Sequence, residues 1–316
     1  MISVIVIGRN EGARLERCLT SVEKALWQMP HEIIYVDSGS TDNSLDIARA
    51  HSVRCLLVND PSPTAGLGRA IGAEAARYEW CLFLDGDMEL DPLFPRYALE
   101  KGNAAHADAV TGVRHDLYYR GSELIGENKN YYQCTCPRQA PEFGGALMIR
   151  RQALVSAGGW SADTVACEEE ELHSRLADKK MLVLEIPDPM IRHTDCVTEN
   201  RSLFRVLFNR RQLGQGEAFR CAMAKHSATA YIRFHKMTFL FFLLDWIALF
   251  LLIFLRPWGI PFCCMIEMLQ VGYYIGRKHP RRFVSQKLFF PYFILGLFTY
   301  HVRDRSARDV SKEVTT

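Results

Sequence analysis

The sequence lacks the features that mark secreted, zinc-binding or repeat proteins. Its ten cysteines are scattered singly, apart from the pairs Cys134 with Cys136 and Cys263 with Cys264, and no pair has zinc spacing with partner histidines. The apolar residues 1–7 have no basic start and no cleavage site, so we expect a strand, a cytoplasmic N-terminal region and mostly free thiols. The sequence also has no internal repeat and a net charge of only +2, and we expect no nucleic-acid partner.

Apolar runs and helical patterns alternate over the first 85 of the 316 residues. We expect strands at residues 2–7, 32–36, 53–58 and 82–84, and helices at residues 14–25, 43–50 and 66–76. Ser40 or Thr41 can cap the second helix. Later segments predict strands at residues 109–113, 146–149 and 182–186, the last ending before Pro187, and a helix at residues 168–177. This alternation predicts an α/β fold with a doubly wound, mainly parallel, Rossmann-like sheet.

Asp85 and Asp87 are the most informative residues, because they directly follow the apolar run at residues 80–84. In an open α/β sheet, ligands bind at the carboxyl ends of the strands. Two carboxylates held side by side repel each other unless a cation lies between them. A divalent ion held by carboxylates and substrate phosphates fits this position best, and hard oxygen ligands favour Mg²⁺ or Mn²⁺. The alternative is a surface turn that happens to carry two acids.

The C-terminal third is basic and then apolar. Residues 201–236 contain eight Lys or Arg residues and one acid, Glu217. Residues 237–255 carry one charge, Asp245, and as a helix would be about 28 Å long, close to the thickness of a bilayer core. A second apolar stretch covers residues 258–276, and a third, of only 15 residues, covers 288–302.

These features divide the chain into four parts. We expect a catalytic domain at residues 1–200, a basic amphipathic juxtamembrane segment at 201–236, apolar helices at 237–302 and a polar tail at 303–316. The apolar part would hold about two transmembrane spans and one interfacial or re-entrant segment. Basic clusters on both sides of that third segment place the catalytic domain and the C-terminus in the cytoplasm, at the cytoplasmic membrane.

Three motifs in order give the chain a family resemblance. Asn10 with Glu11, then residues 36–42, then residues 83–87 resemble the family 2 glycosyltransferases, which have a GT-A fold. The resemblance covers roughly residues 1–195, and the tail is similar to membrane-anchored members that build bacterial polysaccharides. It implies an inverting, metal-dependent glycosyltransferase that uses a nucleotide-sugar donor such as a UDP-sugar. Because the basic and apolar tail places the cleft at the membrane surface, we expect a lipid-linked saccharide as the acceptor.

The resemblance assigns the nucleotide-sugar site to the first three loops. Asp37 would accept a hydrogen bond from the uracil N–H, although a strand-end acid that caps the next turn is the alternative. Asn10 and Glu11 would reach the ribose, and Gly86 lies between the two acids of the third motif. Arg69 matches a position near the sugar and pyrophosphate, or else is a solvated helix arginine. Residues 8–11 depart from the Pro-Thr-Tyr-Asn-Glu run usual in the family.

The same resemblance implies a metal site. Asp87 would be the direct ligand, with Asp85 nearer the ribose and sugar. His193 matches the histidine that often completes the site, and the alternative is a structural histidine.

The catalytic base falls in a run of four glutamates, residues 168–171. The family has an acidic pair, usually Glu-Asp, shortly before Leu-x-x-Arg-Leu, which residues 172–176 match. Glu168 and Glu169 then occupy the pair, and Glu169 takes the position of the base. Glu168, Glu170 and Glu171 stay open as alternatives, because acids in a first turn also stabilise the helix dipole.

Two further motifs concern the acceptor. Gly144, Gly145 and Trp160 match loops around the acceptor site, where Trp160 would stack on a sugar ring or else lie in the core. The Gln-x-x-Arg-Trp sequence of processive synthases is absent around residues 209–212, which favours transfer of a single sugar. Two other functions stay open: an inactive nucleotide-binding membrane scaffold, and a nucleotidyltransferase, although residues 8–11 are poor for cradling a triphosphate.

Overall fold

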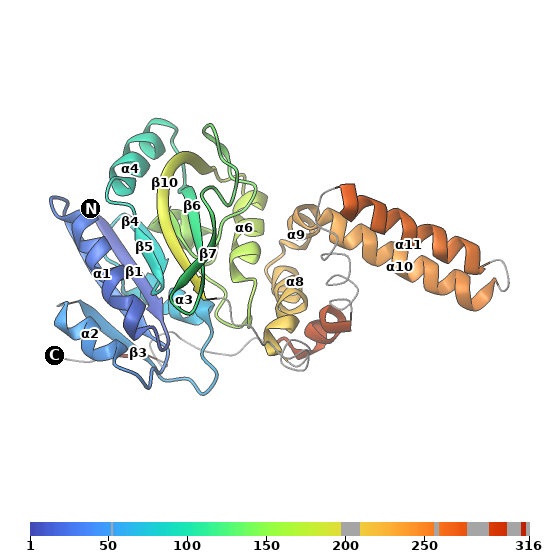
Figure 1. The fold of residues 1–316 in the computed structure, drawn as a ribbon, viewed down its shortest axis with the longest axis horizontal. Helices are drawn as coiled ribbons and strands as arrows, with labels where there is room; N and C mark the ends of the chain where they lie inside the picture. The colour runs from blue at the N-terminus through green and yellow to red at the C-terminus, as the bar shows by residue number, and fades with distance from the viewer. Residues whose placement is uncertain (52, 197–208, 256–258, 277–290, 302–310, 314–316) are drawn as a thin grey trace.

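The computed structural model describes residues 1–51, 53–196, 209–255, 259–276, 291–301 and 311–313. A twisted sheet with helices on both faces forms the larger part, and a helical extension projects from one side of it (Figure 1). The sheet has 11 strands in the order β11-β3-β2-β1-β4-β9-β6-β10-β5, with β7 beside β6 and β8 beside β10. The pairs β3–β2, β2–β1, β1–β4 and β6–β10 are parallel, as the sequence predicts.

The first half of the chain supplies the strands β1 (Ile2–Gly8), β2 (His31–Asp37), β3 (Arg54–Val58), β4 (Trp80–Asp85), β5 (Met88–Leu90), β6 (Ala109–Arg120), β7 (Glu123–Asn128), β8 (Arg138–Gln139) and β9 (Leu147–Arg150). Its helices are α1 (Gly12–Leu26), α2 (Ser44–Ala50), α3 (Ala65–Ala75), α4 (Phe94–Ala104) and α5 (Arg151–Ser156). The second half supplies α6 (Glu168–Asp178), β10 (Val183–Cys196), the 3₁₀ helix η1 (Arg210–Leu213), α8 (Gly214–Ala224), α9 (Ala228–Phe234), α10 (Lys236–Phe254), α11 (Gly259–Gly276) and β11 (Ser311–Glu313).

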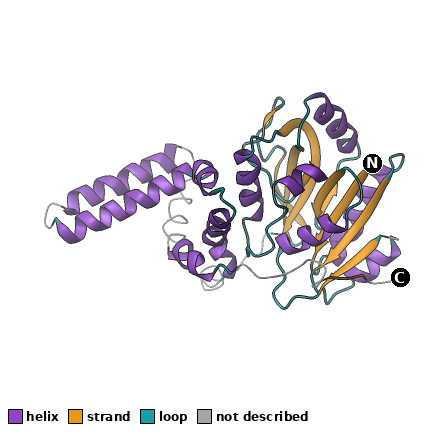
Figure 2. Cartoon of the chain, turned by 180° about the vertical axis from the view of Figure 1, so that it is seen from behind, coloured by secondary structure: helices purple, strands orange, loops and turns teal. Residues whose placement is uncertain are grey.

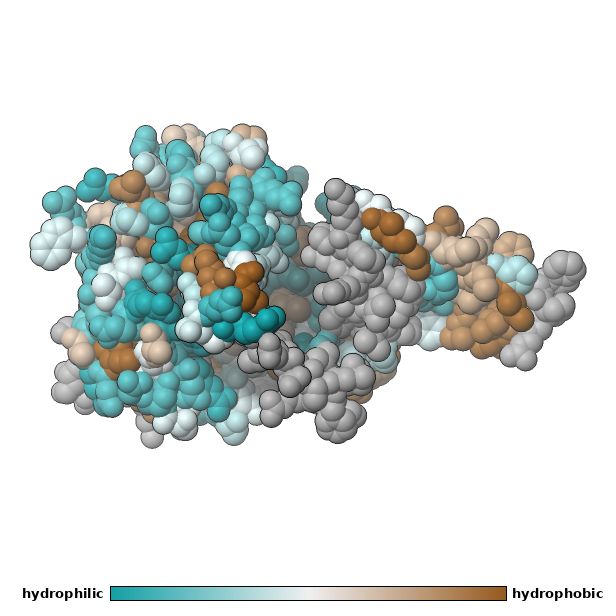
Figure 3. Space-filling model, viewed as in Figure 1, coloured by the Kyte–Doolittle hydropathy of each residue, from teal (hydrophilic) through white to brown (hydrophobic). Residues whose placement is uncertain are grey.

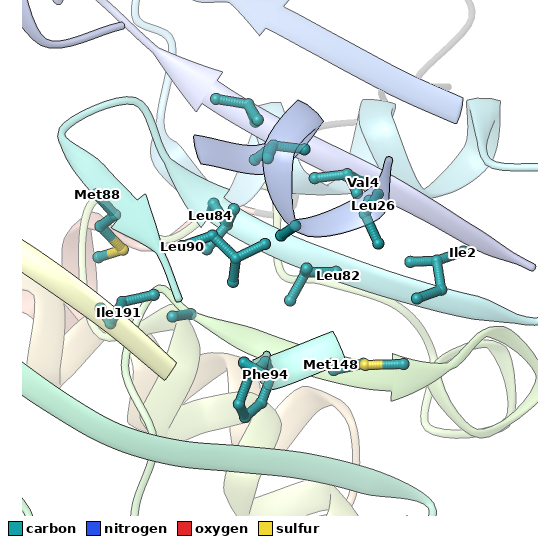
Figure 4. Close-up of a cluster of buried hydrophobic side chains, with 14 of the residues drawn as sticks. Ile2, Val4, Leu26, Leu82, Leu84, Met88, Leu90, Phe94, Met148 and Ile191 are labelled. Atoms are coloured by element: carbon teal, nitrogen blue, oxygen red, sulfur yellow. The ribbon is translucent and has the colours of Figure 1, made fainter. Parts of the chain in front are cut away.

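Two hydrophobic cores lie on opposite faces of the sheet. Figure 2 shows the sheet in orange between the purple helices that cover these faces. Successive side chains of a strand point to opposite faces, so Val4 and Val6 enter one core while Ile5 and Ile7 enter the other. The first core receives α1, α2 and α4, and the second receives α3, α5 and α6. Figure 4 shows part of the first core. The residues labelled there are Ile2, Val4, Leu26, Leu82, Leu84, Met88, Leu90, Phe94, Met148 and Ile191.

Two local predictions are wrong. Neither Ser40 nor Thr41 caps α2; the Ser44 amide donates instead to Asp42 Oδ1, at 3.0 Å. The strand predicted to end before Pro187 continues to residue 196 as β10. Proline has no N–H for the ladder, and the pairing of β10 with β6 shifts register on both sides of Pro189 before it resumes.

The helical extension contains the predicted apolar segments. α10 and α11 run side by side and project away from the sheet, and Figure 3 shows hydrophobic side chains gathered on them. A third helix, residues 291–299, crosses α8 so closely that a Cβ on Gly216 would lie 2.1 Å from the Phe293 carbonyl oxygen. After it, β11 pairs with β3 and forms one edge of the sheet, so the chain returns to the sheet. Residues 197–208, 277–290 and 302–310 lie outside the described residues, and with them the predicted basic clusters on both sides of the third apolar segment.

Candidate active site

The carboxyl ends of β2, β1 and β4 lie next to one another. In the parallel registers, Gly8 is opposite Asp37 and Ile7 is opposite Asp85. The loops that follow these strands are tied together, because the Asn10 amide donates to Ser40 Oγ at 2.9 Å and Asn10 Oδ1 accepts from the Thr41 amide at 2.8 Å. The three predicted motifs therefore meet at one edge of the sheet, where open α/β sheets bind ligands.

Asp37 caps the turn after β2. Its side chain is fully buried, and Oδ1 accepts from the amides of Gly39 at 2.9 Å and Ser40 at 2.7 Å. Its Oδ2 accepts from the Tyr35 hydroxyl at 3.0 Å. This arrangement matches the alternative prediction of a strand-end cap. Oδ2 accepts only one hydrogen bond, so the predicted contact between Asp37 and the nucleotide base stays a prediction.

Glu11 lies beside the two acids of the third motif. Its carboxylate is 2.6 Å from Arg14. Burial raises the pKa of Glu11 to about 7; the Arg14 charge lowers it, and the Asp87 and Asp85 charges raise it. The Gly86 amide donates to the Ile7 carbonyl at 2.8 Å, and a Cβ there would lie 3.4 Å from Glu11 and from the Ile7 carbonyl oxygen, so the turn packs closely on both.

Asp87 faces His193, whose Nε2 lies 3.5 Å from Asp87 Oδ2. Burial would raise the pKa of Asp87, but the hydrogen bond and charge of His193, together with the Arg14 charge, lower it. The other oxygen, Asp87 Oδ1, is buried and has no hydrogen-bond partner among the described residues. A buried carboxylate oxygen without a donor is a position that a cation can satisfy, and this observation fits the predicted metal.

A second carboxylate that the sequence reasoning missed orients His193. Asp116 on β6 is 2% exposed, and its Oδ1 lies 3.1 Å from His193 Nδ1 and 2.7 Å from Arg114 Nε. The hydrogen bonds to Asp116 and Asp87 raise the pKa of His193 to about 9, although burial opposes the change. The Asp116 carboxylate, the His193 imidazole and the Asp87 carboxylate are thus in consecutive contact. In metal sites, a carboxylate in the position of Asp116 fixes the orientation of the metal-binding histidine.

Asp85 turns away from this row toward Arg69. Arg69 is fully buried, and its guanidinium is 2.8 Å from Asp85 Oδ1. The three predicted metal residues are therefore not gathered around one point, and no group of three or more His, Cys, Asp or Glu side chains in the described ranges is placed to hold a metal ion. Of the predicted set, Asp87 with His193 has the better geometry for an ion that would take its other ligands from phosphates and water.

Arg69 joins the metal side of the site to the glutamate helix. Besides Asp85, it contacts Glu168 Oε1 at 2.7 Å and Glu169 Oε1 at 3.1 Å. Burial would lower the pKa of Arg69, but the charges of Asp85, Glu169 and Glu168 raise it. The prediction of a solvated helix arginine is wrong, because a guanidinium between three carboxylates in the interior holds them in place and is not exposed to solvent.

The four glutamates of α6 have different partners. Glu168 is 5% exposed against Arg69, and Glu171 is fully buried in a bidentate pair with Arg175. Glu170 Oε2 lies 3.2 Å from Nε2 of His235, the residue before α10. We call the pair of helices α10 and α11 the apolar hairpin. Glu169 alone combines a place beside Arg69 with a side chain that is 22% exposed. Burial and the Glu168 charge raise the pKa of Glu169, although the Arg69 charge opposes them.

The acceptor-side predictions have mixed outcomes. Gly145 lies directly on the acid network, since a Cβ there would be 2.3 Å from Asp85 Oδ2, and a Cβ on Gly144 would be 2.8 Å from the Tyr132 hydroxyl. Trp160 is 4% exposed and packs edge-on against Phe83, with the Arg69 guanidinium 5.1 Å from its ring centre. The expected stacking of Trp160 on a sugar is thus not supported, because its ring lies in the core, which was the alternative.

Comparison with known proteins adds the family. The profile of the family described as "Glycosyl transferase family 2" matches residues 3–154. Residues 3–154 are therefore similar to glycosyltransferase family 2. The match includes the first three loops with Asn10, Glu11, Asp85 and Asp87, and it ends before the glutamates of α6.

The curated relatives match only part of this chain and only part of their own length. An "Uncharacterized glycosyltransferase" of Rickettsia bellii (strain RML369-C) is 35% identical over 91 residues, which cover 28% of this chain and 28% of that protein. In four such relatives the aligned part spans between 27% and 43% of their own length.

Solved structures share the architecture over nearly the whole chain. S. aureus TarS 1–349 in complex with UDP-GlcNAc has a TM-score of 0.58 at 16% identity, covering 94% of this chain and 88% of that one. The mannosyltransferase PcManGT from Pyrobaculum calidifontis, in complex with GDP-Man and Mn2+, has a TM-score of 0.57 at 15% identity, covering 94% and 87%. This likeness confirms the predicted GT-A-type fold.

Proposed function

We propose that the chain is an inverting glycosyltransferase that moves one sugar from a UDP-sugar to a lipid-linked saccharide at the cytoplasmic face of a membrane. The observation that carries the proposal is the position of Glu169. Its partly exposed carboxylate lies within 3.1 Å of Arg69, which also contacts Asp85 of the strand-end acid motif. The Arg69 guanidinium therefore contacts both the candidate base, Glu169, and Asp85 of the candidate donor site.

The chemistry follows from these side chains. Glu169 would accept the proton of an acceptor hydroxyl, whose oxygen attacks the anomeric carbon as the nucleoside diphosphate departs on the opposite face. Its raised pKa makes the carboxylate a better proton acceptor than an ordinary glutamate, and a general base works best when its pKa is near the operating pH. Arg69 keeps the carboxylates of Asp85 and Glu168 in place during this step.

The proposed cofactor is Mg²⁺ or Mn²⁺, held by Asp87 and His193 with Asp85 nearby. When bound, such an ion offsets the charge that develops on the leaving diphosphate. Asp116 keeps His193 Nε2 turned toward Asp87, and Arg14 lies 3.8 Å from the same carboxylate. PcManGT, a structural neighbour, is a mannosyltransferase observed with GDP-Man and Mn2+.

The membrane part of the proposal is supported by the helical extension. α10 has a mean hydropathy of 2.5, only 17% of its apolar window is buried, and it alone among the described helices is long and apolar enough to cross a membrane. We propose that α11 returns beside it, with Asp245 Oδ1 accepting from Gln270 Nε2 at 2.8 Å between the two helices. Exposed Arg220, Arg233 and Lys236 near the start of α10 suit the anionic cytoplasmic surface.

The end of the chain supports the same topology. The third apolar segment packs on α8, where Thr299 Oγ1 donates to Glu217 Oε1 at 3.2 Å, and β11 then pairs with β3 of the sheet. If α10 and α11 cross the membrane once each, both ends of the chain lie on the side of the catalytic domain. The catalytic helix α6 contacts α8 and α9, so a lipid-linked acceptor at the base of the hairpin would arrive close to Glu169.

A donor screen tests this function. The purified full chain is incubated with radiolabelled UDP-sugars and GDP-sugars, Mg²⁺ or Mn²⁺, and a bacterial lipid extract. We expect label from one UDP-sugar to enter the organic phase with wild-type protein, and not with Glu169→Gln. The matched control is Asp178→Asn, which removes an exposed carboxylate from the end of the same helix. Donor binding without transfer for every combination would instead favour an inactive scaffold.

A further inference from the structure

The base of the apolar hairpin contacts the glutamate helix through one residue. His235 lies between α9 and α10, and its Nε2 is 3.2 Å from Glu170 Oε2. Both atoms are shielded from solvent and neither has a hydrogen-bond partner among the described residues, so the contact is a close approach of an imidazole to a carboxylate and not a hydrogen bond. The contact therefore joins the helix that begins with the candidate base to the first residue before the apolar helix.

A second contact lies beside the first. The Phe234 ring is 4.9 Å from the His173 ring on α6, and His173 is itself fixed by its Nε2, which is 3.1 Å from the Ala140 carbonyl. The rings of Phe234 and His235 are 4.6 Å apart and nearly perpendicular. Phe234 and His235, which join α9 to α10, thus contact α6 at two residues: Phe234 contacts His173, and His235 contacts Glu170.

The first turn of α6 needs such support. It starts at Cys167, which has a positive φ of 64° and makes no side-chain capping hydrogen bond. Four consecutive carboxylates follow, and the Glu168 charge raises the pKa of Glu169, so these two carboxylates repel each other. Arg69 contacts Glu168 and Glu169, and Arg175 pairs with Glu171, so His235 supplies the contact for the remaining acid, Glu170.

We propose that His235 is a positioning residue that holds the first turn of α6, and with it Glu169, against the base of the apolar hairpin. His235 does not touch the reacting groups; it acts through Glu170, the neighbour of Glu169. The proposal rests on the proposed function only for the role of Glu169 as base. It gives the hairpin a second role beyond anchoring, because the residue that begins it also sets the geometry of the active site.

Hydrogen exchange of the full chain in detergent micelles tests the proposal without any substrate. The amides of residues 172–175 bond to the carbonyls of residues 168–171, so their exchange rates report opening of the first turn. We expect His235→Ala and Glu170→Gln each to speed exchange there about tenfold, and the double variant to add little to either. His235→Gln, which keeps a donor, should stay within about twofold of wild type.

The control is Arg233→Ala, which removes an exposed cation from α9, two residues from His235. Unchanged exchange in both His235→Ala and Glu170→Gln, or an equal increase in Arg233→Ala, would overturn the proposal. Where a donor and acceptor are in hand, His235→Ala should lower kcat about tenfold and leave the donor KM unchanged. Faster exchange in a protein without transferase activity would reject the proposed function while supporting the positioning role.

Discussion

A single methyl group at Gly145 should disable the site. The Cβ of Gly145→Ala would lie 2.3 Å from Asp85 Oδ2 and 2.7 Å from an Arg69 guanidinium nitrogen. An ordinary carbon–oxygen contact is about 3.4 Å, so Asp85 must move by roughly 1 Å. It cannot move freely, because Arg69 is fully buried between Asp85, Glu168 and Glu169.

The expected loss follows from that displacement. A shift of about 1 Å in a positioned group costs about 10²-fold in rate, and overpacking of a buried site costs about 1–3 kcal/mol of unfolding free energy. We expect Gly145→Ala to lose about 10²-fold in kcat/KM and to unfold a few degrees earlier by calorimetry. Gly126→Ala is the matched control, because its nearest neighbour would be 3.8 Å away. Wild-type turnover in Gly145→Ala would refute the role assigned to the Asp85–Arg69 contact.

Three further predictions concern the metal side of the site and the topology. Excess chelator should abolish transfer, and Asp87→Asn should do so in a folded protein; full activity in chelator would remove the metal from the mechanism. Asp116→Asn should raise the Mn²⁺ concentration needed for half-maximal activity by about 10–100-fold, because His193 loses the carboxylate that orients it; an unchanged metal titration would reject this role. A reporter fused after Thr316 should be cytoplasmic, and a reporter found outside the cytoplasm would show that the third apolar segment spans.

Sequence patterns predicted the parts of the site that depend on local order. The strand that ends at Asp85 and the helix that begins at Glu168 were located from apolar runs and a motif register, and the structure has both. The sequence predicts these features because a strand buried on both faces is continuously apolar, and because ligands bind at the carboxyl ends of the strands in a parallel sheet.

The rest depends on contacts between residues far apart in the chain. Asp116 is 77 residues from His193, and no motif marks it in the irregular region after residue 88. The burial of Arg69 depends on Glu168, 99 residues away. The amides of Gly39 and Ser40 donate to Asp37 Oδ1, a turn contact that the apolar pattern of the strand does not predict. Local periodicity carries no information on such pairings; only the folded sheet brings the partners together.

The measurement that tests the central claim most directly compares Glu169→Gln with Asp178→Asn in single-turnover sugar transfer, with donor binding measured in parallel. Removing a general base costs about 10²–10⁴-fold in rate, so Glu169→Gln should lose at least about 10²-fold in transfer, while its affinity for the nucleotide-sugar and its folding stay as in wild type. Asp178→Asn should match wild type throughout. Normal transfer by Glu169→Gln would contradict the account, because the one glutamate of the four in α6 that is both partly exposed and beside Arg69 would then not be the base.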